Sequence, residues 1–395
     1  MIDLIILLKQ VRYLYKTHFI LFIITSLIGS RAIAQKTDSS EQISQNPLAK
    51  KNSIHRPYQV SLVPEVSSQG PLSPQVSNDL SFNILGGNNG GVTGFEFGGL
   101  FNLDKTTVQY LQLAGLFNIV GGQVKGVQIA GINNTVQDSV NGFQIAGVNN
   151  FVKGSFSGGQ ISGVFNHVEG SFKGVQIGGV VNYVKNSTQG IQLAGVMNYS
   201  NREMRGTQIS GFINYTKKLK GIQIGIINVA DSSNGYSIGL LNIVKNGYHK
   251  IAFFSDEISN ANIAIKTGND KLYSILGAGY NVSKSEKVFS FGFGDGAEFR
   301  VKNGLYFNPE FYCQYLYLGE WNYVNILSKL RLNFNYHLGK NLSIFAGPSF
   351  NVYYSDQDKN IQDYRTNIPP HNFNPGKLSA HLTDWIGWNV GINLF

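Results

Sequence analysis

A sixteen-residue repeat constrains the fold of this chain more than any other feature of its sequence. The units follow the pattern G-x-Q-[IL]-x-G-x-x-N and start at residues 94, 110, 126, 142, 158, 174, 190 and 206. The first two units depart from it, since Glu96 opens the glutamine column and Tyr110 stands at the first position of the second unit. Two shortened units follow at residues 221 and 235. A unit this short cannot enclose a core alone, so a fixed period predicts an array in which each unit packs against its neighbours.

Two columns of identical side-chain amides run through the array. Stacked amides can hydrogen-bond from one strand to the next when the strands are parallel and in register. We therefore predict that these residues form structural ladders and have no catalytic role. The central members of the two columns are Gln128, Gln144, Gln160 and Gln176 at the third position, and Asn134, Asn150, Asn166 and Asn182 at the ninth.

Two all-β architectures fit this array. In the first, each unit is one rung of a parallel β-solenoid. In the second, each unit is a strand and a turn of an antiparallel meander that continues a membrane barrel, whose strands need ~9–11 residues. Up and down strands of a membrane barrel would give turns that alternate with a 32-residue period, and the turns here do not alternate. A closed barrel also needs stagger between its strands, and equal turns between equal strands give none. The solenoid is favoured, and the barrel meander is the alternative.

The solenoid makes a specific demand on the glycine at the sixth position. Both strand faces carry apolar residues, such as Ile145 on one face and Val148 on the other. We expect a bend at Gly147, and at the equivalent Gly163, that turns both faces inward.

From about residue 248 the repeat gives way to strict alternation of apolar and polar residues. The last strand reads Ile386-Gly-Trp-Asn-Val-Gly-Ile-Asn-Leu-Phe395, with large apolar residues on one face and glycine or asparagine on the other. An aromatic-rich apolar face opposite a polar face is typical of transmembrane β-strands. About eight strands are expected over residues 248–395, enough for a small barrel with a filled interior.

Charged residues fall on the polar faces of these strands. In a closed barrel they would face the interior, where a charge must be paired to be tolerated. The residues concerned are Glu298, Arg300, Glu310, Lys329 and Arg331. Residues 356–383 contain Pro369, Pro370 and Pro375 and are expected to form an exposed loop.

The first 34 residues have the layout of a secretory signal peptide. Basic residues precede an apolar run over residues 19–29, and Ala32 and Ala34 supply small residues for cleavage after Ala34. The apolar run is too short to cross ~30 Å of hydrocarbon as a helix. The sequence therefore predicts export, with residues 1–34 as signal peptide.

The expected domains follow from composition. Residues 35–77 hold five of the ten prolines and are interpreted as a polar linker, because proline lacks the N–H that a paired strand needs. No proline lies between residues 75 and 308, which predicts nearly continuous β-structure. The repeat array is assigned to residues 78–247 and the barrel strands to residues 248–395.

Nothing in the sequence points to catalysis or to a bound metal or cofactor. After signal removal the charge is 28 Lys and Arg minus 22 Asp and Glu, or +6, and it is scattered, which argues against a nucleic-acid partner. The single cysteine, Cys313, excludes an intrachain disulfide and a CxxC metal site. His371 and His381 share a loop with Asp384, which we interpret as a solvated loop and not as a metal site.

The repeat and the closing strand together carry a resemblance. Residues 80–250 resemble the G-x-Q-[IL]-x-G-x-x-N surface-repeat proteins of Gram-negative bacteria, especially those of Bacteroidota. The terminal Phe395 is similar to the signal read by the barrel assembly machinery. This resemblance implies an outer-membrane location and three partners, namely outer-membrane lipid, the barrel assembly machinery and an unknown surface ligand. It implies no defined activity.

We therefore expect a non-enzymatic protein of the outer membrane or cell surface with a structural, adhesive or interaction role. The alternative is a porin-like or transport barrel in which the repeats are transmembrane strands. Strand number separates the two, since about eighteen strands would enclose a water-filled lumen and a small barrel would be plugged by side chains.

Overall fold

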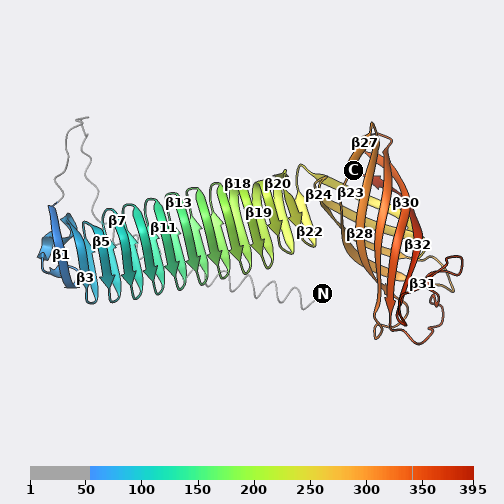
Figure 1. Ribbon diagram of the computed structural model, residues 1–395, viewed down its shortest axis with the longest axis horizontal. Helices are drawn as coiled ribbons and strands as arrows, with labels where there is room; N and C mark the ends of the chain where they lie inside the picture. The colour runs from blue at the N-terminus through green and yellow to red at the C-terminus, as the bar shows by residue number, and fades with distance from the viewer. Residues whose placement is uncertain (1–53, 340) are drawn as a thin grey trace. The chain divides into compact units, whose positions relative to one another are not determined.

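The computed structural model describes residues 54–339 and 341–395, which form two β-sheets (Figure 1). The first sheet is a β-solenoid and the second a closed antiparallel β-barrel. The predicted signal peptide, and residues 35–53 of the expected linker, lie outside the described residues.

A rung of the solenoid has one long strand and one short strand, joined by a bend. The long strands are β5 (Gly91–Gly98), β7 (Val108–Ala114), β9 (Val124–Ala130), β11 (Val140–Ala146), β13 (Phe156–Ser162), β15 (Phe172–Gly178) and β17 (Thr188–Ala194). The short strands are β4 (Gly86–Asn89), β6 (Phe101–Asp104), β8 (Phe117–Val120), β10 (Asn133–Val136), β12 (Asn149–Val152), β14 (Phe165–Val168) and β16 (Val181–Val184). The last rungs are built from β18 (Met197–Ser210), β19 (Ile213–Ile224), β20 (Ile227–Ser233), β21 (Tyr236–Ile238) and β22 (Leu241–Val244).

Each strand pairs in parallel with the equivalent strand of the next rung, without a shift in register over the regular rungs. In β12, β14 and β16 the aligned residues are Asn150, Asn166 and Asn182. In β11 and β13 they include Gln144 and Gln160. The solenoid is thus confirmed, and the antiparallel meander is wrong for the repeats.

The interior of a rung is half polar. In the unit that starts at residue 142, the buried side chains are Gln144, Ala146, Asn150 and Val152, and Val140 of the same long strand joins them. The chain bends after Ala146 as expected, but Ile145 and Val148 are 39% and 37% exposed. The expectation that both apolar faces turn inward was wrong, because strand alternation places Gln144 and Ala146 on the inner face and Ile145 on the outer one.

In the six units that start at residues 126 to 206, glycine at the first repeat position is required by both backbone angle and space. Gly158 has φ 130°, a region that L side chains rarely adopt. A Cβ there would overlap the carbonyl oxygen of Gly142 in the preceding rung. The neighbouring Gly159 is different, since its Cβ would meet only the outward ring of Phe143.

The solenoid starts earlier in the chain than expected. Strand β1 (Ile54–Val63) pairs in parallel with β3 (Val76–Asn83), and β2 (Val66–Ser67) and the 3-10 helix η1 (Gly70–Gln75) connect them. Residues 54–77 therefore belong to the first rung and not to a linker. Proline is tolerated here because Pro57 lies in the part of β1 that pairs only with β3, and Pro71 and Pro74 lie in the helix.

The barrel consists of eight antiparallel strands closed by pairing of the first with the last. They are β23 (Tyr248–Asp256), β24 (Ala261–Gly268), β25 (Tyr273–Tyr280), β26 (Phe289–Gly296), β28 (Leu305–Tyr317), β29 (Asn325–His337), β30 (Leu342–Ser355) and β32 (Leu382–Leu394). Short β27 (Phe299–Lys302) pairs with β28, and β31 (Gly376–Lys377) pairs with β32.

The two faces of the barrel wall have opposite polarity. On β32, Trp388 and Val390 are exposed on the outside, whereas Asn389 and Asn393 are buried inside. Arg300 departs from the expectation of an inward charge. It lies on β27, whose four residues are all exposed, and donates to Asn303, although β27 keeps the register of β26 against β28 as far as Arg300.

We predict that Gly158→Ala destabilises the solenoid by more than about 2 kcal/mol, because it adds backbone strain and a clash with the preceding rung. The measurement is the unfolding midpoint of the full chain in detergent micelles, followed by circular dichroism. Gly159→Ala is the matched control and should unfold near the parent midpoint. Equal effects of the two substitutions would contradict this account of the glycine column.

Candidate functional site

The barrel interior contains the densest cluster of charged side chains among the described residues. It contains four carboxylates and four cations, so the formal charges balance. The members are Asp256, Glu257, Glu298 and Glu310, with Lys250, Lys266, Lys329 and Arg331. All are nearly or fully inaccessible to solvent.

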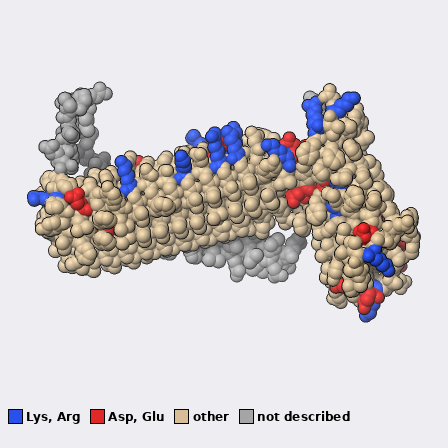
Figure 2. All heavy atoms as spheres, viewed as in Figure 1, with Lys and Arg blue, Asp and Glu red and all other residues tan. Residues whose placement is uncertain are grey.

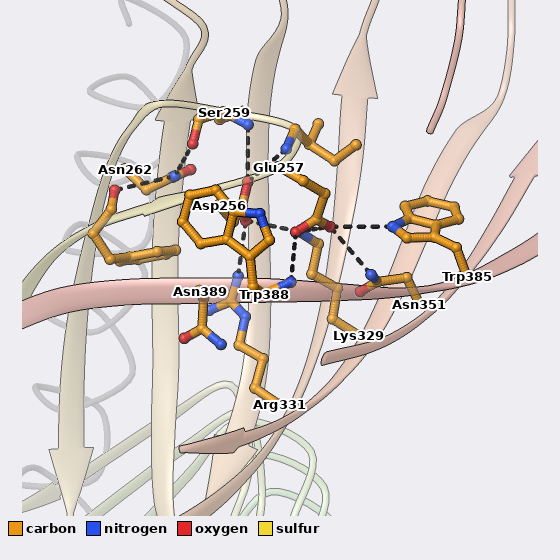
Figure 3. A network of polar contacts seen from close by, with 12 residues as sticks. Asp256, Glu257, Ser259, Asn262, Lys329, Arg331, Asn351, Trp385, Trp388 and Asn389 are labelled. Atoms are coloured by element: carbon orange, nitrogen blue, oxygen red, sulfur yellow. Dashed lines mark hydrogen bonds and ion pairs between the residues drawn. The ribbon is translucent and has the colours of Figure 1, made fainter. Parts of the chain in front are cut away.

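Glu257 accepts bonds from several strands (Figure 3). Its Oε1 accepts from Lys329 Nζ at 3.2 Å and Asn351 Nδ2 at 3.1 Å, and it lies 3.3 Å from Trp385 Nε1. Its Oε2 accepts from the backbone N–H of Trp388 at 3.1 Å. Both oxygens are therefore occupied by donors.

The neighbouring Asp256 is equally well paired (Figure 3). Its Oδ2 lies 2.7 Å from Lys329 Nζ and 3.6 Å from an Arg331 nitrogen. Its Oδ1 accepts from the backbone N–H groups of Ile258 at 3.0 Å and Ser259 at 2.8 Å. The Arg331 guanidinium also lies against aromatic faces inside the barrel, with its carbon 4.5 Å from one ring centre.

A second group of charges surrounds two stacked tyrosines. Tyr248 and Tyr273 stack with ring centres 4.3 Å apart. Tyr273 donates to Glu310 at 2.8 Å, and Lys266 also donates to Glu310. Glu298 accepts from Lys250 at 2.7 Å and from Tyr248 at 3.1 Å.

This arrangement suits a plug better than an active site. Each carboxylate is neutralised by a cation and by further donors, so none is free to act as a base or a nucleophile. Of the five residues predicted to face the interior, Glu298, Glu310, Lys329 and Arg331 meet there. Sequence reasoning missed Lys250, Asp256, Glu257 and Lys266. Strict alternation along β23 and β24 places Lys250, Asp256 and Lys266 on the same face, and Glu257 follows the end of β23.

Part of the predicted exposed loop folds back over the barrel. Arg365 donates to the carbonyl oxygens of Glu257 at 3.1 Å and Ile258 at 3.0 Å. Ile368 and Phe373 pack against a buried apolar cluster. A cavity of about 740 Å³ lies beneath this segment.

The two loop histidines have different partners. His371 contacts Asn367 at 2.8 Å, and His381 contacts the carbonyl oxygen of Ser355 at 3.0 Å. Within the described parts of the chain, no group of three or more His, Cys, Asp or Glu is placed to hold a metal ion. Cys313, on β28, is a free thiol.

The amide columns form continuous ladders inside the solenoid. Asn150 Nδ2 donates to Asn166 Oδ1 at 3.0 Å and to the carbonyl oxygen of Ile161 at 2.7 Å. Gln160 Nε2 donates to Gln144 Oε1 at 3.0 Å. The eight central ladder residues are all fully buried. These bonds satisfy polar groups that would otherwise be costly to bury.

Two carboxylic acids begin the glutamine ladder. Gln112 Nε2 donates to Glu96 at 2.7 Å and to Asp104 at 2.6 Å, and both acids are buried. Burial raises the pKa of Glu96, and burial together with the nearby Glu96 carboxyl raises the pKa of Asp104 well above its usual range. The repeat pattern marked only Glu96, as the residue that opens the glutamine column.

No protein-family model, curated protein or solved structure matches this chain. The resemblance to the surface-repeat proteins, carried by the repeat and the closing strand, therefore stays a prediction. Among the described residues, no helix is long and apolar enough to cross a membrane.

We predict that Lys329→Met destabilises the barrel by about 3 kcal/mol or more, because it leaves Asp256 and Glu257 buried without their shared cation. Adding Asp256→Asn should recover part of the loss. The unfolding midpoint in detergent micelles measures both effects. Lys302→Met, on exposed β27, is the control and should be neutral, and a neutral Lys329→Met would show that the buried pairing contributes little.

We predict that the solenoid loses stability as the pH rises above about 4, the ordinary pKa of an Asp carboxyl. Asp104 keeps its proton in the folded chain over pH values at which it ionises in the unfolded chain, so rising pH favours unfolding. Asp104→Asn should flatten this dependence when thermal unfolding is followed by circular dichroism. The control Asp138→Asn, on an exposed turn, should behave as the parent does; an unchanged slope in Asp104→Asn would exclude this carboxyl as the cause.

Proposed function

We propose that this protein is an exported outer-membrane protein whose barrel is its membrane anchor and whose solenoid provides a structural or interaction surface. One observation carries the proposal, namely that the barrel is apolar outside and polar inside. Ile386, Phe350 and Phe334 are 64%, 50% and 52% exposed, while charged side chains fill the interior. Water would disfavour such an outer surface, and lipid would favour it.

The length of four barrel strands supports the same proposal. Strands β28, β29, β30 and β32 have 13, 13, 14 and 13 residues, whereas β23, β24, β25 and β26 have 9, 8, 8 and 8. A membrane-crossing strand needs ~9–11 residues. The signal peptide predicted for residues 1–34 would bring the chain to the periplasm, and the terminal Phe395 supports the barrel assembly machinery as a partner.

The transport alternative loses its support. It needs the repeats to be transmembrane strands, which would pair antiparallel within the barrel wall. The repeats instead pair in parallel in a sheet of their own. The remaining eight-stranded barrel is of the size that side chains fill, and its paired charges fill the interior. We therefore propose a structural or interaction role that is carried by the solenoid surface, with no catalytic activity.

We expect the mature chain to stay in the membrane pellet after carbonate extraction of isolated envelopes, because a barrel anchor resists a wash that removes peripheral proteins. Immunoblotting of pellet and supernatant measures this. Removing Phe395 should lower the pelleted amount sharply, whereas the control Leu378→Ala, in the exposed loop, should not. Recovery of the parent chain in the supernatant would overturn the proposal.

A further inference from the structure

The outer surface of the solenoid is apolar along the whole bend between long and short strands. The seventh repeat position, which we call the bend edge, carries an aliphatic or aromatic residue in every unit, 37–46% exposed. These residues are Leu100, Leu116, Ile132, Val148, Val164, Val180, Val196, Phe212, Ile226 and Leu240. Apolar patches larger than a few hundred Å² mark contact sites in soluble proteins.

The columns that flank the bend edge are also free of charge. The second, fourth, eighth and tenth repeat positions point outward and contain no Asp, Glu, Lys or Arg in any unit. The tenth position includes His167, stacked 4.7 Å from both Phe151 and Tyr183. Burial lowers the pKa of His167 to about 4, so it is neutral at pH 7.

The opposite edge holds the charges. We call the turns after the short strands, with the first outward residue of the next long strand, the turn edge. Over residues 92–247 it carries eleven Lys and Arg and four acids, a net +7, because the other two acids, Glu96 and Asp104, are buried. Figure 2 shows Lys and Arg gathered along one edge of the solenoid.

The depth of the apolar zone matches half a bilayer. From the bend to the second repeat position, the long strand runs four residues, or roughly 13 Å. One leaflet contributes about half of a ~30 Å hydrocarbon core. With the bend edge in hydrocarbon, the turn edge would therefore lie at the level of the lipid headgroups.

The backbone of the bend edge is compatible with hydrocarbon. Hydrocarbon offers no hydrogen bonds, so every N–H exposed to it must be paired within the protein. The N–H of Gly147 donates to Ala130, and those of Val148 and Asn149 donate to Ile132, at 3.0–3.2 Å. The same bonds recur in the neighbouring rungs.

The geometry points to lipid as the partner of the bend edge. The uncharged columns lie on the long-strand face, the bend and the short-strand face, which point in different directions. One rigid copy of the chain could cover a single face, whereas acyl chains can cover all three. The cationic turn edge complements anionic lipid phosphates.

We propose that the solenoid lies in one leaflet of a membrane rich in anionic lipid, with its bend edge among the acyl chains and its turn edge among the headgroups. This inference rests on the proposed membrane location. It adds that the repeat array is itself a lipid-binding element, in the manner of an interfacial amphipathic helix.

The test uses the full chain with Cys313→Ser, reconstituted into phosphatidylcholine vesicles containing phosphatidylglycerol. A single cysteine carries an environment-sensitive fluorophore, placed by Val164→Cys on the bend edge or by Ser155→Cys on the turn edge. Acyl-chain-brominated lipid should quench the label at 164 at least about twofold more than the label at 155. A third label, placed by Phe311→Cys on the outer barrel wall, reports on the anchor.

The outcomes separate the two proposals. Quenching at 311 with none at 164 overturns the lipid contact and leaves the membrane anchor intact. No quenching at either position overturns both. If the label at 164 is shielded from water but is not quenched by brominated lipid, and the shielding grows with protein concentration, a second copy of the chain is the partner. This result also overturns the lipid contact.

A second variant pair addresses the contact by changing the bend edge around a label placed in a neighbouring rung. Val148→Asp with Val164→Asp and Val180→Asp should reduce quenching of a label placed by Ile132→Cys at least about twofold, because charges are costly in hydrocarbon. Ser139→Asp with Ser155→Asp and Ser171→Asp is the turn-edge control. Circular dichroism establishes that both variants are folded, and equal quenching in folded variants would contradict the proposal.

Discussion

The side-chain amide ladder is the interaction on which the solenoid depends. From Asn102 to Asn228, each Asn of the ladder donates both to the Asn of the next rung and to a backbone carbonyl, as Asn150 does to Asn166 and Ile161. A one-residue slip of one rung would turn its amides to the outer face and leave those of the next rung buried without their partners, at a cost of ~1–3 kcal/mol for each group. The ladder therefore fixes the register of all the strands, and the outward columns follow from that register.

The barrel also has polar groups inside and apolar groups outside, but ion pairs, not amide ladders, hold its interior together. Its wall is apolar outside, and its interior is held by ion pairs that join distant strands, such as Lys329 of β29 with Asp256 of β23. Both parts of the described chain thus bury networks of hydrogen-bonded polar groups and leave many apolar side chains outside. Because both parts have apolar outer surfaces, contact with lipid is proposed for both the barrel and the solenoid.

Much of the fold and some of the barrel interior could be predicted from the sequence. The period gave the parallel stacking, and alternation placed Glu310 and Lys329 on inward faces. Other features depend on long-range closure. Asp256 and Lys329 are 73 residues apart, so neither their contact nor the loop contact of Arg365 with Glu257 follows from local pattern.

The sequence by itself determined the repeat length, the amide columns, the all-β class and the alternation of the last strands, because these depend on local periodicity. Only the tertiary structure decided which face of each strand lies inside. Ile145 and Val148 are as apolar as Val152, yet only Val152 is buried. Period-two alternation defines two faces without ranking them, and the bend at Gly147 together with the amide hydrogen bonds selects the inner one. The pairing of β1 with β3 was decided in the same way, by a neighbour distant in the chain.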